Sequence, residues 1–222
     1  MLIFAHRGAA ASRREENTIP AFAGALAAGL QLETDGRISA DGKAVLVHDS
    51  YVWRCAVFRR VHKCTAERLA TFGVPTLDDL YAALGTDFEL SIDLKVAAAG
   101  DLLLAAADRA GATEHLWLVS DRLDVLAALR AKSAGVRLVH ESRAGTFGDG
   151  RDHSDRLAAA GVTSQNTAVE GWTPAAVAYS HACGVLAFGS LVNAPDGFDS
   201  AAALGLDAFY TDRLDLAATG LR

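Results

Sequence analysis

The sequence lacks the features that mark a disulfide-rich or membrane-spanning protein. Its 222 residues include only 3 Cys, 4 Pro and 1 Met. The cysteines are odd in number and match no zinc spacing, so we interpret them as reduced thiols of a cytoplasmic protein. After Met1 there is no charged leader, long apolar run or small-residue cleavage site. We therefore expect neither a signal peptide nor a transmembrane segment.

An excess of positive charge is also missing. The chain has 21 Lys and Arg against 27 Asp and Glu, a formal net charge of −6 and a pI near 5.6. Nucleic acids and anionic membrane surfaces select basic faces, so this balance argues against either one as the main partner. A local basic cluster remains able to bind the phosphate of a small molecule.

The length and composition indicate one compact domain over residues 1–222, near the lower end of the size range of a (β/α)8 barrel. Short apolar runs bounded by Gly, Asp or Asn alternate with Ala/Leu-rich helical stretches, which is typical of β-α units around a parallel sheet. We expect strands to begin near Leu2, Leu30, Ala44, Phe88, Leu116, Val136, Val162, Val185 and Ala208. The expected helices are Ile19–Ala28, Leu77–Leu84, Asp101–Ala110, Arg122–Lys132, Ser154–Ala160, Thr173–Cys183 and Ser200–Leu204.

Nine expected strands are one more than a barrel needs. The segment at Ala44 follows its predecessor through Asp41-Gly42 with no room for a helix, so we interpret the two as a hairpin or an extended second strand. Tyr51–Val74 and Glu141–Asp152 are the most irregular stretches, and we expect them to be loops over the site.

Acidic side chains alternate with apolar ones in two of the expected strands. Glu33 and Asp35 share one face of the second strand, and Asp93 lies on the polar face of the strand at Phe88. Because helices cover the outside of a β-α barrel, the polar faces must point into it. These three carboxylates would then converge at the carboxyl ends of the strands.

Three carboxylates in close proximity repel one another unless a cation lies among them. Oxygen-only ligands favour one divalent cation, Mg²⁺ or Ca²⁺ before Mn²⁺, over zinc. The alternative is that a basic residue such as Lys95 neutralises them. Arg7 and Lys95 are also candidates to bind a phosphate.

Two histidines follow apolar strand residues and should emerge beside the acidic cluster. They are His6 and His48, and as a pair they can serve as base and acid at a reacting centre. Of the other histidines, His140 ends a strand and is a possible neighbour of the site. The remaining histidines do not form such a pair around an acidic cluster. They are His62, His115, His153 and His181.

Five short motifs occur in one order: His6-Arg7-Gly8, Glu16-Asn17-Thr18, Glu33-Thr34-Asp35, Asp41-Gly42 and His48-Asp49. This series resembles the N-terminal signature of the glycerophosphodiester phosphodiesterase family. Two later segments are similar to its Glu-x-Lys and final-strand motifs, namely Asp93-Leu94-Lys95 and the segment ending in Thr211-Asp212. The resemblance implies a single (β/α)8 TIM barrel. The insertion that is usual in the family after the His48-Asp49 strand is expected to be short or absent in this chain.

The same resemblance implies a metal-dependent hydrolase that converts glycerophosphodiesters to glycerol 3-phosphate and an alcohol. It makes His6 and His48 the acid/base pair, and either one can be the initial base. It makes Glu33, Asp35 and Asp93 the metal ligands, and Arg7 and Lys95 the residues that bind the substrate phosphate. Glu16 and Asn17 are expected to brace the first loop and cap its helix.

The sequence departs from the family pattern at two places. Asp93 replaces a glutamate, and the Trp-x-Val-Asn motif is absent, with Phe188 as a candidate for the aromatic position and Asn193 out of register. Two alternatives therefore stay open: a lysophospholipase D or sphingomyelinase D-like phosphodiesterase, and a barrel that binds phosphate esters without catalysis. For the first, Tyr51 and Trp53 belong to a stretch that could receive an acyl chain. The alcohol group of the substrate and the oligomeric state stay open as well.

Overall fold

The computed structural model describes residues 1–54, 57–142 and 151–216. Its main feature is a nine-stranded sheet in the order β1-β11-β10-β9-β8-β7-β6-β2-β3, closed into a barrel by a further pairing of β1 with β2. Eight strands are parallel, and β3 (Ala44–Leu46) is antiparallel to β2. The barrel strands are β1 Leu2–Ala5, β2 Gln31–Ile38, β6 Leu90–Leu94, β7 Leu116–Ser120, β8 Arg137–Glu141, β9 Ser164–Thr167, β10 Leu186–Gly189 and β11 Ala208–Thr211.

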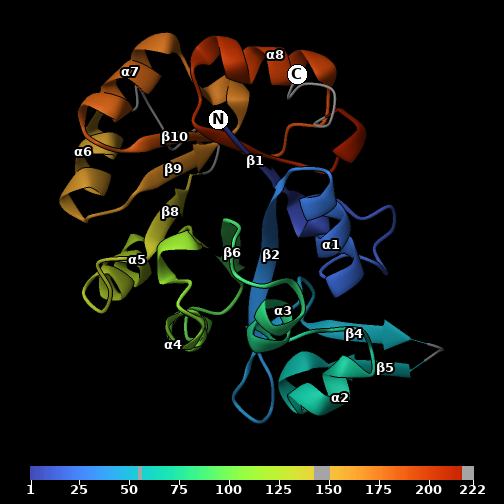
Figure 1. Cartoon of the computed structure of the whole chain (residues 1–222). Helices are drawn as coiled ribbons and strands as arrows, with labels where there is room; N and C mark the ends of the chain where they lie inside the picture. Colours follow the sequence, from blue (N-terminus) through green and yellow to red (C-terminus); the bar gives the residue numbers. More distant parts are fainter. Residues whose placement is uncertain (55–56, 143–150, 217–222) are drawn as a thin grey trace.

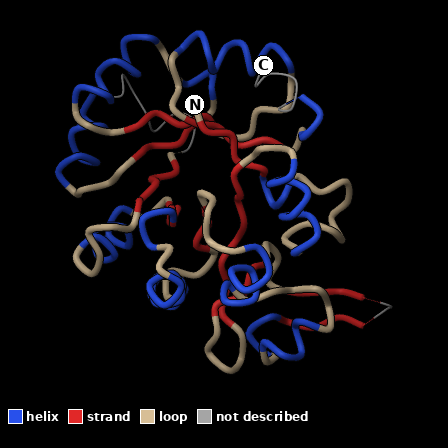
Figure 2. Tube along the Cα trace, in the orientation of Figure 1, coloured by secondary structure: helices blue, strands red, loops and turns tan. Residues whose placement is uncertain are grey.

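Helices surround this ring of strands (Figure 1), and the tube in Figure 2 shows them as an outer layer. They are α1 Ile19–Ala27, α3 Leu77–Leu84, α4 Ala99–Ala110, α5 Leu123–Arg130, α6 Arg151–Ala159, α7 Pro174–Ala182 and α8 Pro195–Leu204. The predicted TIM barrel and the hairpin at Ala44 are therefore confirmed. In the described ranges no helix combines the length and the apolar character that a membrane span requires.

The predicted start of the last helix was wrong. It begins at Pro195 instead of Ser200, because Pro at the first helical position needs no hydrogen-bonded N–H and has a φ suited to a helix. The first helix is capped by Thr18, whose Oγ1 accepts from the Ala21 N–H at 3.4 Å.

The prediction of a loop over Tyr51–Val74 was also wrong. This insertion contains the antiparallel strands β4 (Tyr51–Arg54) and β5 (Val57–Arg60), followed by α2 (Ala66–Ala70). A small separate core holds it together. That core consists of the buried side chains of Val45, Val52, Val61, Cys64, Ala66, Leu69 and Val74. In the other predicted loop, Glu141 ends β8 and Asp152 lies in α6, and residues 143–150 are outside the described residues.

Aromatic side chains fill the inside of the barrel. Phe4 stacks on Tyr210 with ring centroids 5.3 Å apart, and Trp117 and Phe188 complete the cluster. All four side chains are buried. Because they fill the middle of the barrel, a cavity can open only toward the ends of the strands, and barrel enzymes have their active sites at the carboxyl ends.

Gly8 is required by the turn that follows β1. Its φ is +79°, and a Cβ atom there would lie 2.9 Å from the Cβ of Ala21. We expect Gly8→Ala to lower the free energy of unfolding by about 1–3 kcal/mol, because both the left-handed backbone and the contact oppose a side chain.

Denaturant unfolding would measure this effect, with Gly24→Ala on α1 as the matched control. A Cβ atom at Gly24 meets nothing within 4 Å, so alanine should instead stabilise the helix by about 0.5–1 kcal/mol. Equal effects of the two substitutions would contradict this account of Gly8.

Candidate active site

A polar cavity of about 240 Å³ opens at the carboxyl ends of the barrel strands. Six of the seven residues that the sequence predicted for the site line this cavity: His6, Arg7, Glu33, Asp35, Asp93 and Lys95. The side chains come from β1, β2, β6 and the residues that follow them. Cα register explains part of this convergence, since Asp35 of β2 is paired with Asp93 of β6.

His6 is held by a carboxylate that the sequence analysis did not assign. Its Nδ1 lies 2.7 Å from Oδ1 of Asp212, which follows β11. Asn193 donates from Nδ2 to the other oxygen of Asp212 at 2.7 Å and accepts from its backbone N–H at 2.8 Å. With Nδ1 on Asp212, the imidazole has Nε2 available for proton exchange. The final Thr211-Asp212 motif was the signal for this partner, and the pairing itself depends on β11 lying beside β1.

The environment of His6 raises its pKa above the usual value. Burial lowers this pKa, but the hydrogen bond to Asp212 and the negative charge of Glu33 outweigh that effect. A raised pKa means that the folded protein favours the protonated imidazole. The His6–Asp212 pair therefore stabilises the fold below the ordinary pKa of histidine, and this stabilisation is lost as the pH rises through the raised pKa.

We expect Asp212→Asn to lower the pKa of His6, because the negative partner is lost while the burial remains. An NMR titration of the His6 ring in both proteins measures this shift. Asp207→Asn is the matched control. An oxygen of Asp207 lies 2.7 Å from Nε2 of His181, and this pair is outside the cavity, so the substitution should leave the pKa of His6 unchanged. A His6 pKa that stays raised in Asp212→Asn would show that Asp212 does not set it.

Glu33 is one of two buried acids of the cavity, the other being Asp35. Burial, followed by the charge of Asp35, raises the pKa of Glu33 to about 8, although His6 opposes this shift. Its Oε2 accepts the backbone N–H of Arg7 at 2.8 Å. A cation bound beside Glu33 would favour the charged form of this carboxyl.

Asp35 is surrounded by cationic and amide donors. Asn17 donates to its Oδ2 at 3.1 Å, Arg7 Nε lies 3.4 Å from the same oxygen, and Lys95 Nζ lies 3.1 Å from Oδ1. Lys95 also contacts Asp93. As the side chains stand, Arg7 and Lys95 therefore neutralise carboxylates, which was the alternative that the sequence left open for these two residues.

Asn17 and Glu16 brace the loop after β1, but the prediction that they cap its helix was wrong, because the N-cap of α1 is Thr18. Asn17 has φ +58° and accepts from Thr34 Oγ1 at 2.7 Å, and Glu16 accepts from Arg7 Nη1 at 3.1 Å. Both contacts are directed to protein groups.

The three predicted metal ligands face one cavity, but they do not surround a single point. Over the described ranges, no group of three or more His, Cys, Asp or Glu side chains is arranged to hold a metal ion. The residues nevertheless fit a hard cation chemically. Their carboxylates supply only oxygen donors, which are the ligands that Mg²⁺ and Ca²⁺ prefer.

His48 lies in a second cavity, of about 390 Å³, together with Asp49, Arg13 and Arg14. Its Nδ1 is 2.9 Å from Oδ1 of Asp49, and its carbonyl accepts from Arg37 Nε at 2.8 Å. Asn17 lines this second cavity and bonds to Asp35 in the first, so the two cavities have a common wall. Both candidate histidines thus have Nδ1 on a carboxylate.

Two other histidines form a pair that the sequence did not suggest. His140 and His153 have ring centroids 5.0 Å apart, and the hydroxyl of Ser142 lies 3.2 Å from Nδ1 of His140 and 2.8 Å from Nε2 of His153. Burial lowers both pKa values, and that of His153 falls to about 4. They line a separate cavity beside Glu141, which contains none of Glu33, Asp35 and Asp93.

The segment from β10 to Asn193 places other residues in the polar cavity than the aromatic Phe188 suggested from the sequence. Phe188 lies in the buried aromatic cluster, and it is Ser190 and Leu191 that line the polar cavity. Asn166 of β9 also lines it, and its buried Oδ1 has no hydrogen-bond partner among the described residues. Asn166 was missed because a polar strand such as Ser164–Thr167 has no apolar alternation to assign its faces.

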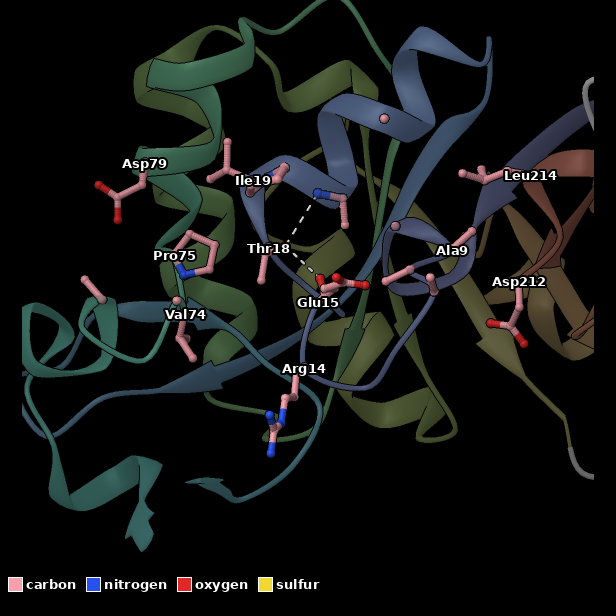
Figure 3. A pocket seen from close by; sticks show the side chains of 18 of the residues that line it. Ala9, Arg14, Glu15, Thr18, Ile19, Val74, Pro75, Asp79, Asp212 and Leu214 are labelled. Carbon is pink, nitrogen blue, oxygen red and sulfur yellow. Dashed lines mark hydrogen bonds between the residues drawn. The ribbon is translucent and has the colours of Figure 1, made fainter. Parts of the chain in front are cut away.

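A larger groove, of about 1,080 Å³, lies outside the ring of strands (Figure 3). Its lining is mainly apolar and includes Ala9, Ile19, Val74 and Leu214. It shares Asp212 with the His6 pair and none of the cavity's carboxylates or cations. We therefore place the chemistry in the smaller polar cavity.

A family model and a curated relative both indicate the same family for this chain. The model of the glycerophosphoryl diester phosphodiesterase family matches residues 6–216. A Mycobacterium tuberculosis protein named "Probable glycerophosphodiester phosphodiesterase 2" is 30% identical, with 97% of this chain and 88% of the relative covered.

Solved structures share the fold. The glycerophosphodiester phosphodiesterase of Thermotoga maritima has a TM-score of 0.85 at 23% identity, covering 100% of this chain and 98% of that one. A phosphodiesterase of Oleispira antarctica, solved in complex with the product sn-glycerol-3-phosphate, has a TM-score of 0.81 at 18% identity, covering 100% and 96%.

Proposed function

The chain belongs to the glycerophosphoryl diester phosphodiesterase family, and from this premise we propose that it hydrolyses glycerophosphodiesters to glycerol 3-phosphate and an alcohol. The observation that carries the proposal is the polar cavity, where a carboxylate-bound imidazole faces three acids, a guanidinium and an ammonium. The Oleispira antarctica phosphodiesterase, which has this fold, was solved with sn-glycerol-3-phosphate as its product, and this supports the choice of substrate.

In the proposed reaction the glycerol hydroxyl next to the phosphate attacks phosphorus, and the bond from phosphorus to the leaving alcohol breaks. One histidine takes the hydroxyl proton, and the other gives a proton to the alcohol oxygen. The raised pKa of His6 favours it as the acid, which leaves His48 as the base. Water then opens the cyclic phosphate, and the two histidines exchange roles.

Arg7 and Lys95 bind the phosphate oxygens in this scheme, since a guanidinium and an ammonium match a phosphodiester anion. Their contacts with Glu16, Asp35 and Asp93 orient both side chains toward the cavity. Glu33, Asp35 and Asp93 would hold a divalent cation. When bound, such a cation supplies positive charge that offsets the negative charge developing on the phosphoryl oxygens.

The magnitudes are adequate for an enzyme. Positioning of the neighbouring hydroxyl can contribute about 7–11 kcal/mol, and each proton transfer contributes about 100- to 10,000-fold in rate. Together these effects fall within the range that enzymes typically provide.

The test is hydrolysis of glycerophosphocholine, followed by ³¹P NMR and a choline assay. We expect glycerol 3-phosphate and choline in equal amounts, and no turnover of an analogue that lacks the hydroxyl next to the phosphate. Equal turnover of the analogue would remove the cyclic step. If no hydrolysis is detected with Mg²⁺, Mn²⁺ or Ca²⁺ across neutral pH, the catalytic proposal fails. The remaining hypothesis is then a barrel that binds phosphate esters without catalysis.

One observation favours a second candidate substrate. The large apolar groove reaches Asp212, the partner of His6, and has room for an acyl chain. If the protein hydrolyses lysophosphatidylcholine faster than glycerophosphocholine, it is a lysophospholipase D-type phosphodiesterase.

A further inference from the structure

The hairpin of β4 and β5 extends away from the barrel beside α2 (Figure 1). Its register pairs Tyr51 with Arg60 and Trp53 with Phe58. Because side chains alternate along a strand, these four residues lie on the same side of the hairpin. We call this side, with Arg14, the aromatic face.

The three rings of the aromatic face are exposed, at 44% for Tyr51, 56% for Trp53 and 51% for Phe58. Tyr51 and Phe58 stack with centroids 4.8 Å apart. On the opposite side of the hairpin, Val52 is only 8% exposed and packs in the small core of the insertion. The hairpin therefore packs on the rest of the protein through the side that carries Val52. This packing does not explain why three aromatic rings are half exposed on the other side.

Positive charge gathers around these rings. The Arg14 guanidinium lies over the Trp53 ring, 5.4 Å from its centroid, and Arg60 is exposed on the aromatic face itself. Arg59 is also exposed, but it is paired with Val52 and extends from the other side of the hairpin. Within the part of the chain that the structure describes, none of these three guanidiniums forms an ion pair with a carboxylate. A net charge of −6 for the whole chain therefore conceals a cationic region at this hairpin.

We propose that the aromatic face docks the protein on the surface of an anionic phospholipid bilayer. Tyr and Trp favour the boundary between hydrocarbon and water, and arginines near an anionic leaflet are attracted to lipid phosphates. A second copy of this chain fits the face poorly, because a two-fold contact would bring identical arginines together without acidic partners.

Docking through this face would bring one of the site cavities close to the lipid. Tyr51 and Trp53 line the same cavity as His48. Lipid binding itself is independent of the proposed hydrolysis, because it requires the hairpin and not the acids of the barrel. The two proposals can therefore fail separately.

Tryptophan fluorescence tests the docking directly. The other two tryptophans are Trp117 and Trp172, which are 1% and 4% exposed, so a spectral change would report mainly on Trp53. We expect vesicles containing phosphatidylglycerol to shift the emission to shorter wavelength and to carry the protein into the pellet on centrifugation. Vesicles of phosphatidylcholine alone should do neither. Binding should also weaken as salt screens the charges.

The variants separate the contribution of charge from that of the rings. Arg14→Ala with Arg60→Ala should weaken vesicle binding about 25-fold, from roughly fivefold for each arginine near an anionic surface. Arg109→Ala is the control that also removes a positive charge, and its side chain pairs with Asp78 outside the hairpin. It should bind like the wild type, and Trp53→Ala should lose the emission shift and most of the binding.

Circular dichroism would verify that each variant is folded, which is expected because the substituted side chains are exposed. Three outcomes would overturn the proposal. They are no binding to anionic vesicles, equal binding to neutral vesicles, and a dimer in solution that Trp53→Ala dissociates while vesicles remain unbound.

Discussion

Replacing either candidate histidine, His6 or His48, with alanine is expected to lower kcat/KM for glycerophosphocholine by about 100- to 10,000-fold, because each replacement removes one proton-transfer group. Binding of the phosphodiester should persist, since Arg7 and Lys95 remain. The double variant should lose little more than the worse single one, because groups that act as a unit have non-additive effects.

This prediction is informative because the two histidines line different cavities. His140→Ala is the control, since His140 lies near the carboxyl end of β8 but beside His153 in a third cavity. Its activity should stay near that of the wild type. If His48→Ala retains full activity while His6→Ala does not, the base must be another group, and the assignment of His48 fails.

Removal of divalent cations should have a second large effect. We expect a chelator to lower activity by about 100-fold or more, because a bound ion contributes several kcal/mol at the phosphoryl oxygens. Independently of activity, an ion at 100 times its Kd should stabilise the fold by about 2.7 kcal/mol. For a chain of this size that corresponds to a rise in Tm of about 5–10 °C.

Glu33→Gln provides the sharpest version of this test. Its pKa of about 8 means that the cation-free protein holds Glu33 largely protonated near pH 7. Glutamine should therefore change the stability of the cation-free protein by less than about 1 kcal/mol, yet abolish the rise in Tm. Glu141→Gln is the matched control, since it lines the same cavity without being a proposed ligand. An unchanged response to the ion in Glu33→Gln would exclude Glu33 as a ligand.

Much of the fold could be predicted from local sequence. Alternation assigned Glu33 and Asp35 to one face of β2, and both line the cavity together with Asp93. Asp41-Gly42 with no room for a helix predicted a hairpin or an extended second strand, and the antiparallel pairing of β2 with β3 shows that it is a hairpin. The errors arose where local signals were ambiguous. The residues of Tyr51–Val74 gave no clear periodicity, and the helix expected from Ser200 begins at Pro195.

The sequence by itself determined the order of β-α units, the faces of the acidic strands and the family, because periodicity, caps and motifs depend on residues that are near one another in the chain. The tertiary structure decided the partners. Closure of the barrel brings Asp212 to His6 across 206 positions, places Lys95 beside Asp35 and Asp93, and leaves His48 in a cavity walled by Tyr51 and Trp53. Electrostatic and hydrogen-bond partners depend on distance in space, and that distance is set only when the strands have closed into a barrel.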